Sequence, residues 1–314
     1  MRLLITRPLP EAVMRAAQAR FEVTARESTL PLEVGELRAA LRDHDLVLPT
    51  LGDLFSAAVF ADVTRPRARL LANFGVGINH IDVAAARAAG IAVSNTPGAV
   101  TDATADIALM LMLMTARRAG EGERLLRSGR WQGWHPTQML GQHLSGKRVG
   151  IIGMGRIGRA IARRCHHGFG MEVVFHNRSV TEAGLPARQV PLAEAMGADV
   201  VVVAVPGGPA TRHLIGPEAL SHMRAHAILV NIARGDVVDE AALVEALETG
   251  RIAGAGLDVY EREPLVPEAL CRMEQVTLLP HLGTATLEVR EAMGMMALDN
   301  LVAFAEGRPL PNPV

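Results

Sequence analysis

The sequence predicts an α/β fold in which helices cover parallel sheets. Short apolar strands alternate with helical segments over residues 1–98, and the alternation resumes at Val149. The second stretch opens on Val149–Gly158, which reads VGIIGMGRIG, an apolar strand that runs into three glycines and then a helix. Such alternation indicates parallel strands, because each helix returns the chain across the sheet. The length of 314 residues allows one oversized domain or two ordinary ones.

The first stretch begins with an apolar run that predicts a strand. Apolar residues then recur at helical spacing, and Gly90 ends the last helix of this part. The expected strands are 2–6, 46–48, 70–74 and 91–93, and the expected helices are 11–20, 34–42 and 83–89. The segment Asn95-Thr96-Pro97-Gly98 then predicts a turn.

A long helix is expected over 101–118, with Thr101 or Asp102 as its cap. Residues 129–146 are polar and rich in turn formers, which predicts a loop or arm. From Val149 on, the expected strands are 149–152, 172–176, 199–205, 227–231, 254–257 and 276–279, and the expected helices are 156–167, 192–196, 217–222, 239–248 and 285–305. This order suits a doubly wound sheet.

The composition narrows the class of protein. Apolar residues make up 49% of the chain and aromatic residues only 3%, so aliphatic side chains must fill the core. The formal net charge of −1 argues against a general binder of nucleic acid or membrane surfaces. Two cysteines make no disulfide framework. No apolar run is long enough to span a bilayer, and the N-terminal run is too short for a signal peptide. We therefore expect a soluble cytoplasmic protein.

The glycine motif predicts a dinucleotide-binding site. Gly153 allows a tight turn, Gly155 lets the backbone approach a pyrophosphate, and Gly158 lets the helix pack closely on the strand. The phosphates would lie at the helix N-terminus, where unpaired N–H groups favour negative charge. The candidate residues of this loop are Gly153, Met154, Gly155, Arg156, Ile157 and Gly158.

The strand after this motif ends without a carboxylate. An NAD site commonly has an acid about 20 residues beyond the glycines, where it binds the ribose 2′-OH. Here the strand ends in His176, Asn177, Arg178 and Ser179. An arginine pairs with a 2′-phosphate and a hydroxyl adds a donor, so the segment predicts NADPH over NADH. The alternative is that Arg178 is a solvated surface charge and the site accepts both cofactors.

Three residues beyond the cofactor motif have the types that reduction of a 2-oxo acid needs. Arg234, Glu263 and His281 each come at or shortly after the end of an expected strand, where open α/β sheets bind ligands. An arginine can hold a carboxylate with its planar fork, and a histidine can protonate an alkoxide as hydride arrives. A carboxylate beside that histidine would orient it and favour its charged form. From spacing alone, each of the three could equally be structural.

Five segments together resemble the D-isomer-specific 2-hydroxyacid dehydrogenase family, and the likeness runs along nearly the whole chain. They are GVGINHID (75–82), GIIGMGRIGRAIA (150–162), NIARGDVVDEAALVEAL (231–247), GAGLDVYEREP (254–264) and LLPHLGTAT (278–286). The chain looks most like the glyoxylate and hydroxypyruvate reductases of this family. The resemblance implies that Arg234 orients the substrate, that Glu263 partners the histidine, and that His281 donates the proton.

The resemblance also implies two Rossmann-like domains. Residues 1–98 and 287–314 would form a discontinuous substrate-binding domain, and residues 99–286 an inserted coenzyme domain. A cleft between them would close on the ligand and exclude water.

The resemblance also implies roles for residues outside these three, at positions that match the family's motifs. Val76 and Gly77 resemble a turn whose N–H groups hold the substrate carboxylate, and Leu51 and Gly52 match a substrate-facing loop. The implied cofactor contacts outside the glycine loop are Thr104, Pro206, Thr211, Ile232, Ala233, Asp258 and Gly283. Trp134 resembles an arm residue that reaches the active site of the neighbouring subunit, although it could equally serve in packing, and the resemblance implies a homodimer. His222 and His226 are four residues apart but have no third ligand, so we expect no metal site.

The sequence therefore predicts an NADPH-dependent reductase that converts glyoxylate to glycolate and hydroxypyruvate to D-glycerate. Two alternatives remain open at this point. One is a dehydrogenase of the same family for another acid, such as phosphoglycerate or a bulkier 2-oxo acid. The other is a protein that keeps the fold as a cofactor sensor without catalysis.

Overall fold

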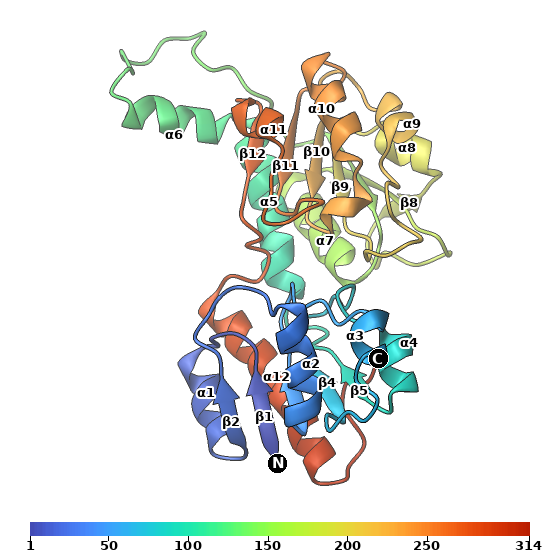
Figure 1. The fold of residues 1–314 in the computed structure, drawn as a ribbon. Helices are drawn as coiled ribbons and strands as arrows, with labels where there is room; N and C mark the ends of the chain where they lie inside the picture. The colour runs from blue at the N-terminus through green and yellow to red at the C-terminus, as the bar shows by residue number, and fades with distance from the viewer. The chain divides into compact units, whose positions relative to one another are not determined.

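The computed structural model describes all 314 residues, and the chain divides into two compact units. Unit 1 contains residues 1–100 and 285–314, and unit 2 contains residues 101–284. The expected domain limits, 98 and 286, lie within two residues of the limits of these units. Both units are built on a parallel sheet, which confirms the predicted fold class (Figure 1).

Unit 1 has a five-stranded sheet in the order β2-β1-β3-β4-β5. The strands are β1 (Arg2–Ile5), β2 (Glu22–Ala25), β3 (Leu46–Leu48), β4 (Leu70–Ala72) and β5 (Ala92–Ser94), and all pairs are parallel. The helices are α1 (Glu11–Gln18), α2 (Val34–Asp43), α3 (Ala57–Ala61), α4 (Val83–Ala88) and α12 (Leu287–Ala305).

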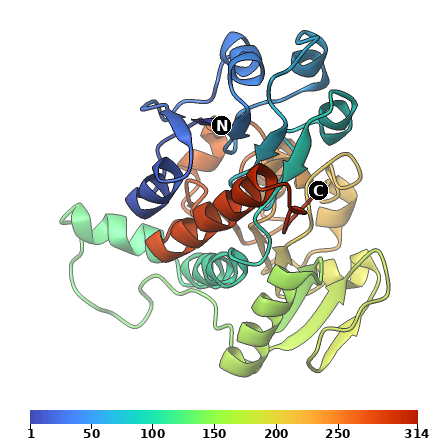
Figure 2. The ribbon, with the colours of Figure 1, turned by 90° about the horizontal axis from the view of Figure 1, so that it is seen from below.

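Alternating side chains of the central strands build two apolar layers in unit 1. Leu3 and Ile5 of β1 pack with α1 and α12 on one face of the sheet, while Leu4 packs with α2, α3 and α4 on the other. This alternation is the two-residue period of a strand. Figure 2 shows α12 as the long red helix along which the chain returns to unit 1.

Unit 2 has a seven-stranded parallel sheet in the order β12-β11-β10-β9-β6-β7-β8. The strands are β6 (Arg148–Ile152), β7 (Glu172–His176), β8 (Ala187–Gln189), β9 (Val200–Val203), β10 (Ile228–Asn231), β11 (Gly254–Leu257) and β12 (Val276–Leu278). The helices are α5 (Thr101–Ala116), α6 (Ala119–Arg127), α7 (Arg156–Phe169), α8 (Leu192–Met196), α9 (Pro217–Ser221), α10 (Glu240–Glu248) and α11 (Glu268–Arg272), with a 3-10 turn η1 at Gly235–Val237.

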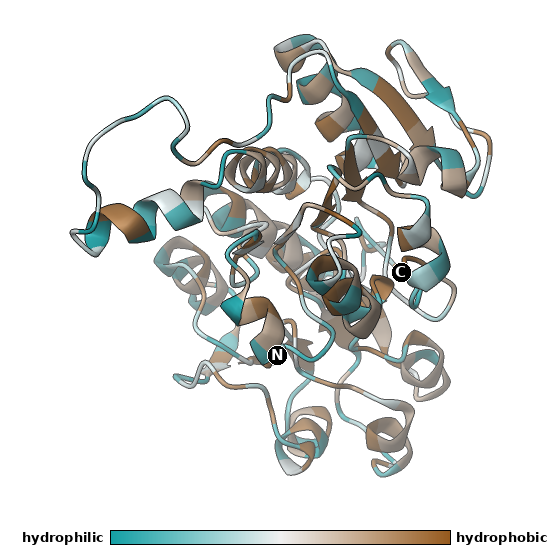
Figure 3. Ribbon diagram, turned by 90° about the horizontal axis from the view of Figure 1, so that it is seen from above, coloured by the Kyte–Doolittle hydropathy of each residue, from teal (hydrophilic) through white to brown (hydrophobic).

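Helices cover both faces of this sheet, and hydrophobic residues follow the strands and the helix faces that pack on them (Figure 3). α5 and α7 cover one face, and α8, α9, α10 and α11 cover the other. The strand order reverses next to β6, so that β7 and β8 lie on one side of it and β9–β12 on the other. Ligands of such sheets bind outside the carboxyl ends of the strands at this reversal.

Most expected strands and helices are confirmed with small shifts of their ends. β3, β7, β11 and α8 have the expected limits. The sequence analysis missed β2, β8, α3, α6 and α11, which are short or carry few buried residues; α6 has none. None of the helices combines the length and the apolar character that crossing a bilayer requires.

Candidate active site

Arg234, Glu263 and His281 follow three strands that are neighbours in the sheet of unit 2. Arg234 comes after β10, Glu263 after β11 and His281 after β12. Because these strands run parallel, their carboxyl ends meet at one edge. The sheet thus brings together three residues that are far apart in the chain.

His281 and Glu263 form a hydrogen-bonded pair. Nδ1 of His281 lies 2.8 Å from Oε2 of Glu263, and Oε1 of Glu263 accepts the N–H of Tyr260 at 3.1 Å. Burial alone would raise the pKa of Glu263, but the hydrogen bond and charge of His281, the Tyr260 N–H and the charge of Arg234 together lower it. Glu263 is therefore ionised at neutral pH, and it leaves Nε2 of His281 available for a ligand.

Arg234 presents a largely buried guanidinium without a hydrogen-bonded carboxylate. Its Nη1 donates to the carbonyl of Ala233 at 2.7 Å, and its Nε is buried without a partner. Burial lowers the pKa of Arg234, while the charges of Glu263 and Asp236 act in the opposite direction. An arginine stays charged in proteins, so this cation is suited to an incoming anion.

The buried side chain of Asn231 fixes the segment that carries Arg234. Its Nδ2 donates to the carbonyl of Arg234 at 2.9 Å, and its Oδ1 accepts the N–H of Ala233 at 3.0 Å. Gly235 then lies against the loop of Glu263, because a Cβ added there would lie 1.8 Å from the carbonyl carbon of Tyr260. No larger residue fits, so Gly235 sets how closely these two loops approach.

Asp258 anchors the turn after His281. Its Oδ1 accepts the N–H of Leu282 at 2.6 Å and its Oδ2 accepts the N–H of Gly283 at 2.8 Å. The carbonyl of Gly283 accepts the hydroxyl of Thr104 at 3.1 Å. Burial raises the pKa of Asp258 even though these N–H groups and the charge of His281 act against the shift. The structure thus brings together three expected cofactor residues, and it gives Asp258 a structural role that the sequence analysis did not assign.

The glycine loop joins β6 to α7 as the motif predicts. Gly153 has a φ of 103°, and a Cβ there would lie 2.7 Å from the carbonyl oxygen of Ala204. A Cβ on Gly158 would lie 2.0 Å from the carbonyl oxygen of Gly153. Both glycines are thus required by the fold itself.

Gly155 differs from the other two glycines of the motif. A Cβ at this position would meet nothing within 4 Å, and no side chain caps the N-terminus of α7. Open space beside unpaired N–H groups at a helix N-terminus fits a pyrophosphate. The residues present therefore suit a dinucleotide.

The segment after β7 forms a turn that contains Arg178, an arginine without an ion-pair partner. Asn177 accepts the N–H of Met154 at 3.3 Å and donates to the carbonyl of Ser179 at 2.9 Å, which links this turn to the glycine loop. Arg178 is exposed, and its guanidinium makes no ion pair. Arg156 and Ile157 begin α7.

Two further pairs of expected cofactor residues lie in loops after β9 and β10. The hydroxyl of Thr211 donates to the carbonyl of Pro206 at 2.7 Å. Ile232 and Ala233 have buried side chains, and the carbonyl of Ala233 is already bound to Arg234.

The structure contains no group of three or more His, Cys, Asp or Glu side chains that could hold a metal ion.

Comparisons with known proteins agree with this arrangement. Residues 109–283 match the NAD binding domain of the D-isomer specific 2-hydroxyacid dehydrogenases. The chain belongs to this family. It is 43% identical to the glyoxylate reductase of Pyrococcus furiosus and 44% identical to that of Thermococcus gammatolerans, over 100% of this chain and 95% of each relative.

Solved structures show the same similarity. A Thermus thermophilus protein matches with a TM-score of 0.93 and 42% identity over 100% of both chains. An NADPH-dependent glyoxylate/hydroxypyruvate reductase of Sinorhizobium meliloti, in complex with NADP and malonate, matches with a TM-score of 0.89 and 37% identity over 100% of this chain and 96% of that chain.

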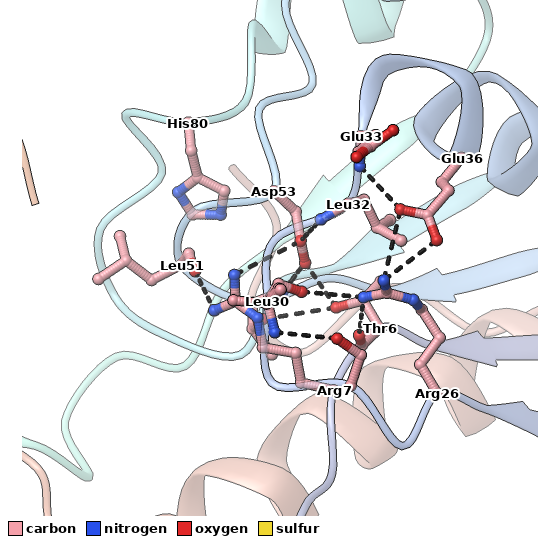
Figure 4. Close-up of polar contacts among 12 residues, drawn as sticks. Thr6, Arg7, Arg26, Leu30, Leu32, Glu33, Glu36, Leu51, Asp53 and His80 are labelled. Atoms are coloured by element: carbon pink, nitrogen blue, oxygen red, sulfur yellow. Dashed lines mark hydrogen bonds and ion pairs between the residues drawn. The ribbon is translucent and has the colours of Figure 1, made fainter. Parts of the chain in front are cut away.

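The expected substrate loop Leu51-Gly52 belongs to unit 1, where Arg7 links the Leu51 carbonyl to Asp53 (Figure 4). Nη1 of Arg7 donates to the carbonyl of Leu51, and Nη2 lies 3.8 Å from Oδ1 of Asp53. Gly52 has a φ of 99°, and a Cβ there would lie 2.9 Å from Nη2 of Arg7.

Asp53 is the fully buried centre of this cluster. It accepts the hydroxyl of Thr6 at 2.5 Å and the N–H groups of Thr50 and Leu32 at 2.9 and 3.0 Å. The sequence analysis missed Arg7 and Asp53, because a single arginine or aspartate after an apolar run carries no signal of its partners. The hydroxyl of Thr50 also donates to Asp53 at 3.2 Å, so five bonds or contacts fix this carboxylate beside the Leu51-Gly52 loop.

Among the other expected substrate and arm residues, Val76 and Trp134 are exposed and Gly77 is half-buried. Val76 and Gly77 lie in the turn between β4 and α4. Trp134 is 80% exposed in the arm after α6, which extends away from the rest of unit 2 in Figure 1. Trp131 is more tightly held, since its indole N–H donates to Gln138 at 3.3 Å.

The contrast between Gly158 and Gly155 gives a matched pair of substitutions. Gly158→Ala forces a methyl group against a backbone carbonyl, and we expect it to lower the free energy of unfolding by about 1–3 kcal/mol. Gly155→Ala meets open space, so it should leave stability unchanged but weaken dinucleotide binding about tenfold or more, because the methyl group would occupy the pyrophosphate position. Urea denaturation and titration of NADPH fluorescence measure the two effects. Equal loss of stability in both variants would contradict the assignment of Gly158 to helix packing and of Gly155 to dinucleotide binding.

Proposed function

We propose that this protein reduces small 2-oxo acids with NADPH, converting glyoxylate to glycolate and hydroxypyruvate to D-glycerate. The observation that carries the proposal is Arg234, whose largely buried guanidinium has no hydrogen-bonded carboxylate and lies at the same sheet edge as the His281–Glu263 pair. The first group suits a carboxylate and the second suits a carbonyl oxygen that gains a proton. Relatives named glyoxylate reductase support the choice of substrate.

In this proposal, Arg234 binds the substrate carboxylate through its planar fork. The segment from Asn231 to Gly235 is fixed by the hydrogen bonds of Asn231 and by the close packing of Gly235 on Tyr260. The guanidinium therefore needs little reorganisation when the substrate arrives. The N–H groups of Val76 and Gly77 bind the same carboxylate, and the Leu51-Gly52 loop also contacts the substrate.

His281 protonates the carbonyl oxygen of the substrate. Its Nδ1 is held by Glu263, so Nε2 carries the proton that is transferred. The ionised Glu263 stabilises the imidazolium before the transfer and orients the ring during it. The geometry is that of a general acid with its orienting carboxylate.

The residues of unit 2 hold the dinucleotide. When bound, NADPH supplies the hydride that reduces the carbonyl carbon. The N–H groups from Gly155 to Gly158 bind the pyrophosphate, while that of Met154 is held by Asn177 and fixes the loop. The rest of the dinucleotide is lined by Thr104, Pro206, Thr211, Ile232, Ala233, Asp258 and Gly283. Asn177, Arg178 and Ser179 bind the ribose end, where the unpaired guanidinium of Arg178 pairs with the 2′-phosphate.

The direct test of this function is an absorbance assay at the nicotinamide band. We expect rapid oxidation of NADPH with glyoxylate and with hydroxypyruvate, and slower oxidation of NADH. Turnover only with a bulkier or phosphorylated acid would assign another substrate of the same family. Failure across a broad panel of 2-oxo acids, with NADPH still bound, would favour the cofactor-sensing alternative.

Arg178→Ala tests the basis of the cofactor preference within the same assay. Loss of one charge-assisted pair should raise the KM for NADPH about tenfold and leave the KM for NADH unchanged. Arg188→Ala is the matched control, because Arg188 lies nearby on β8 but pairs with Glu172 and Glu194. An equal effect of Arg178→Ala on both cofactors would remove this residue from 2′-phosphate recognition.

Glu263→Gln tests the roles of the histidine pair through pH. The lowered pKa of Glu263 means that its charge is present at every pH above its ordinary value of 4.5 and is lost only as the pH falls through the lowered value. Without this charge the imidazolium is less stable, so the fall of reductase activity with rising pH should begin at lower pH. The reduction rate of Glu263→Gln should drop about 10–100-fold. His281→Ala should nearly abolish turnover while NADPH still binds. An unshifted pH profile in Glu263→Gln would exclude an electrostatic role for this carboxylate.

We further propose that the protein is a homodimer. An apolar groove of about 740 Å³ lies between α5 and α7 and is lined by Leu109, Met110, Leu113, Met114 and Phe169 among others. The arm after α6 also exposes apolar side chains, notably Trp134 and Leu140. Exposed apolar surface of this kind is typical of an interface.

Light scattering should give twice the 33.5 kDa mass of one chain. Leu113→Glu in the groove should yield monomers, because it places a charge in the apolar contact. Val34→Glu, an exposed apolar position of unit 1, is the matched control and should leave the mass unchanged. A monomeric wild type would reject the proposal. Trp134→Ala should retain the dimeric mass but raise the KM for the 2-oxo acid if this residue reaches the neighbouring active site.

A further inference from the structure

The turn Gly75-Val76-Gly77 leaves two of its N–H groups unbound, while all three of its carbonyls are bound. Neither the N–H of Val76 nor that of Gly77 donates a hydrogen bond to another group of the chain. All three carbonyls of the turn, in contrast, accept hydrogen bonds within unit 1. The inference drawn from this contrast rests on the proposed function, in which these N–H groups bind the substrate carboxylate.

Asn73 binds two of the three carbonyls. This residue directly follows β4 and is 1% exposed. Its Nδ2 donates to the carbonyl of Gly75 at 2.9 Å and to that of Gly77 at 3.0 Å. Its Oδ1 lies 2.9 Å from Nε2 of His80, and this contact fixes the orientation of the amide. A single buried side chain thus spans the whole turn.

Asn95 binds the third carbonyl from the next strand of the sheet. It follows β5, and its Nδ2 donates to the carbonyl of Val76 at 2.9 Å. The backbone N–H of Asn95 donates in turn to the carbonyl of Asn312 in the C-terminal tail. The tail is itself held by the fully buried Asn300, whose Oδ1 accepts the N–H of Asn312 at 2.9 Å.

The direction of the peptide dipoles follows from these bonds. A peptide group whose carbonyl is bound toward the protein turns its N–H away from it, because the two point in opposite directions. Successive N–H groups that point the same way form a concave site for an anion. We infer that Asn73 and Asn95 are positioning residues that hold the Val76-Gly77 amides ready for the substrate carboxylate.

Asn73→Asp tests the inference with almost no change in shape. The substitution keeps the oxygen that faces His80 and replaces the donor with an oxygen, which repels the carbonyls of Gly75 and Gly77. We expect the KM for glyoxylate to rise about tenfold or more, with a smaller change in kcat and no change in NADPH affinity. Asn95→Asp, which removes only the bond to Val76, should produce a smaller effect in the same direction.

Asn79→Asp is the matched control for charge. Asn79 is exposed in the same GVGINH segment and makes no hydrogen bond, so its substitution adds the same charge near the turn without releasing a carbonyl. If Asn79→Asp raises the KM as much as Asn73→Asp and Asn95→Asp do, charge alone explains the effect and the inference is overturned. Thermal unfolding of each variant separates loss of the turn from loss of the fold.

Calorimetric titration with glycolate in the presence of NADP⁺ gives a readout that does not depend on turnover. Glycolate affinity should fall in Asn73→Asp and Asn95→Asp and remain in Asn79→Asp. Wild-type protein that neither reduces glyoxylate nor binds glycolate would reject the proposed function itself. Wild-type activity together with unchanged KM and glycolate affinity in both asparagine variants would reject only the positioning role.

Discussion

The candidate site depends on the hydrogen bond between His281 and Glu263, and other contacts of the loops of unit 2 hold both partners in place. Each partner is fixed independently, since the Tyr260 N–H holds one oxygen of Glu263 and Asp258 holds the two residues after His281. His281 itself has a φ of 55°, a left-handed conformation that costs free energy and persists because its surroundings enforce it. The Tyr260 hydroxyl also donates to the carbonyl of Leu279 at 2.9 Å, which joins the two loops a second time.

Glu263 and the neighbouring Asp258 show how the bonding partners of a carboxylate set its pKa. Burial acts to raise the pKa of both Asp258 and Glu263, yet the pKa of Asp258 is raised and that of Glu263 is lowered. The difference arises because Glu263 has a direct hydrogen bond to a titratable imidazole and the nearby charge of Arg234, whereas Asp258 bonds only to backbone N–H groups. Glu263 can therefore respond to the charge of His281, while Asp258 serves to hold the chain. Both acids follow β11, and in the sequence only the family motif separates their expected roles.

Strands and helices were predictable from the sequence where apolar side chains follow a regular local pattern. The candidate site residues were predictable where they lie in a family motif. Strands such as β7 and β11 are apolar runs bounded by turn residues, so their limits follow from the sequence. The edge strands β2 and β8 are mostly exposed and have no such run. The proposed catalytic residues Arg234, Glu263 and His281 lie in recognisable motifs, but the roles of Gly235 and Arg7 depend on segments distant in the chain. Gly235 meets the Tyr260 peptide and Arg7 meets the Leu51 carbonyl, and neither contact leaves a local signature.

Three asparagines at the ends of strands each bind the turn that follows them through the side-chain amide. Asn73 after β4, Asn177 after β7 and Asn231 at the end of β10 each donate from Nδ2 to a carbonyl two to four residues further on. A short amide can do this because it offers a donor and an acceptor at once, which no aspartate can do. The oxygen of each side chain is also engaged, by His80, by the N–H of Met154 and by the N–H of Ala233. Each asparagine therefore fixes the turn that follows it, and those turns carry the Val76-Gly77 amides, the Arg178 guanidinium and Arg234. The same device thus sets the positions of the groups proposed to bind the substrate carboxylate and the cofactor phosphate.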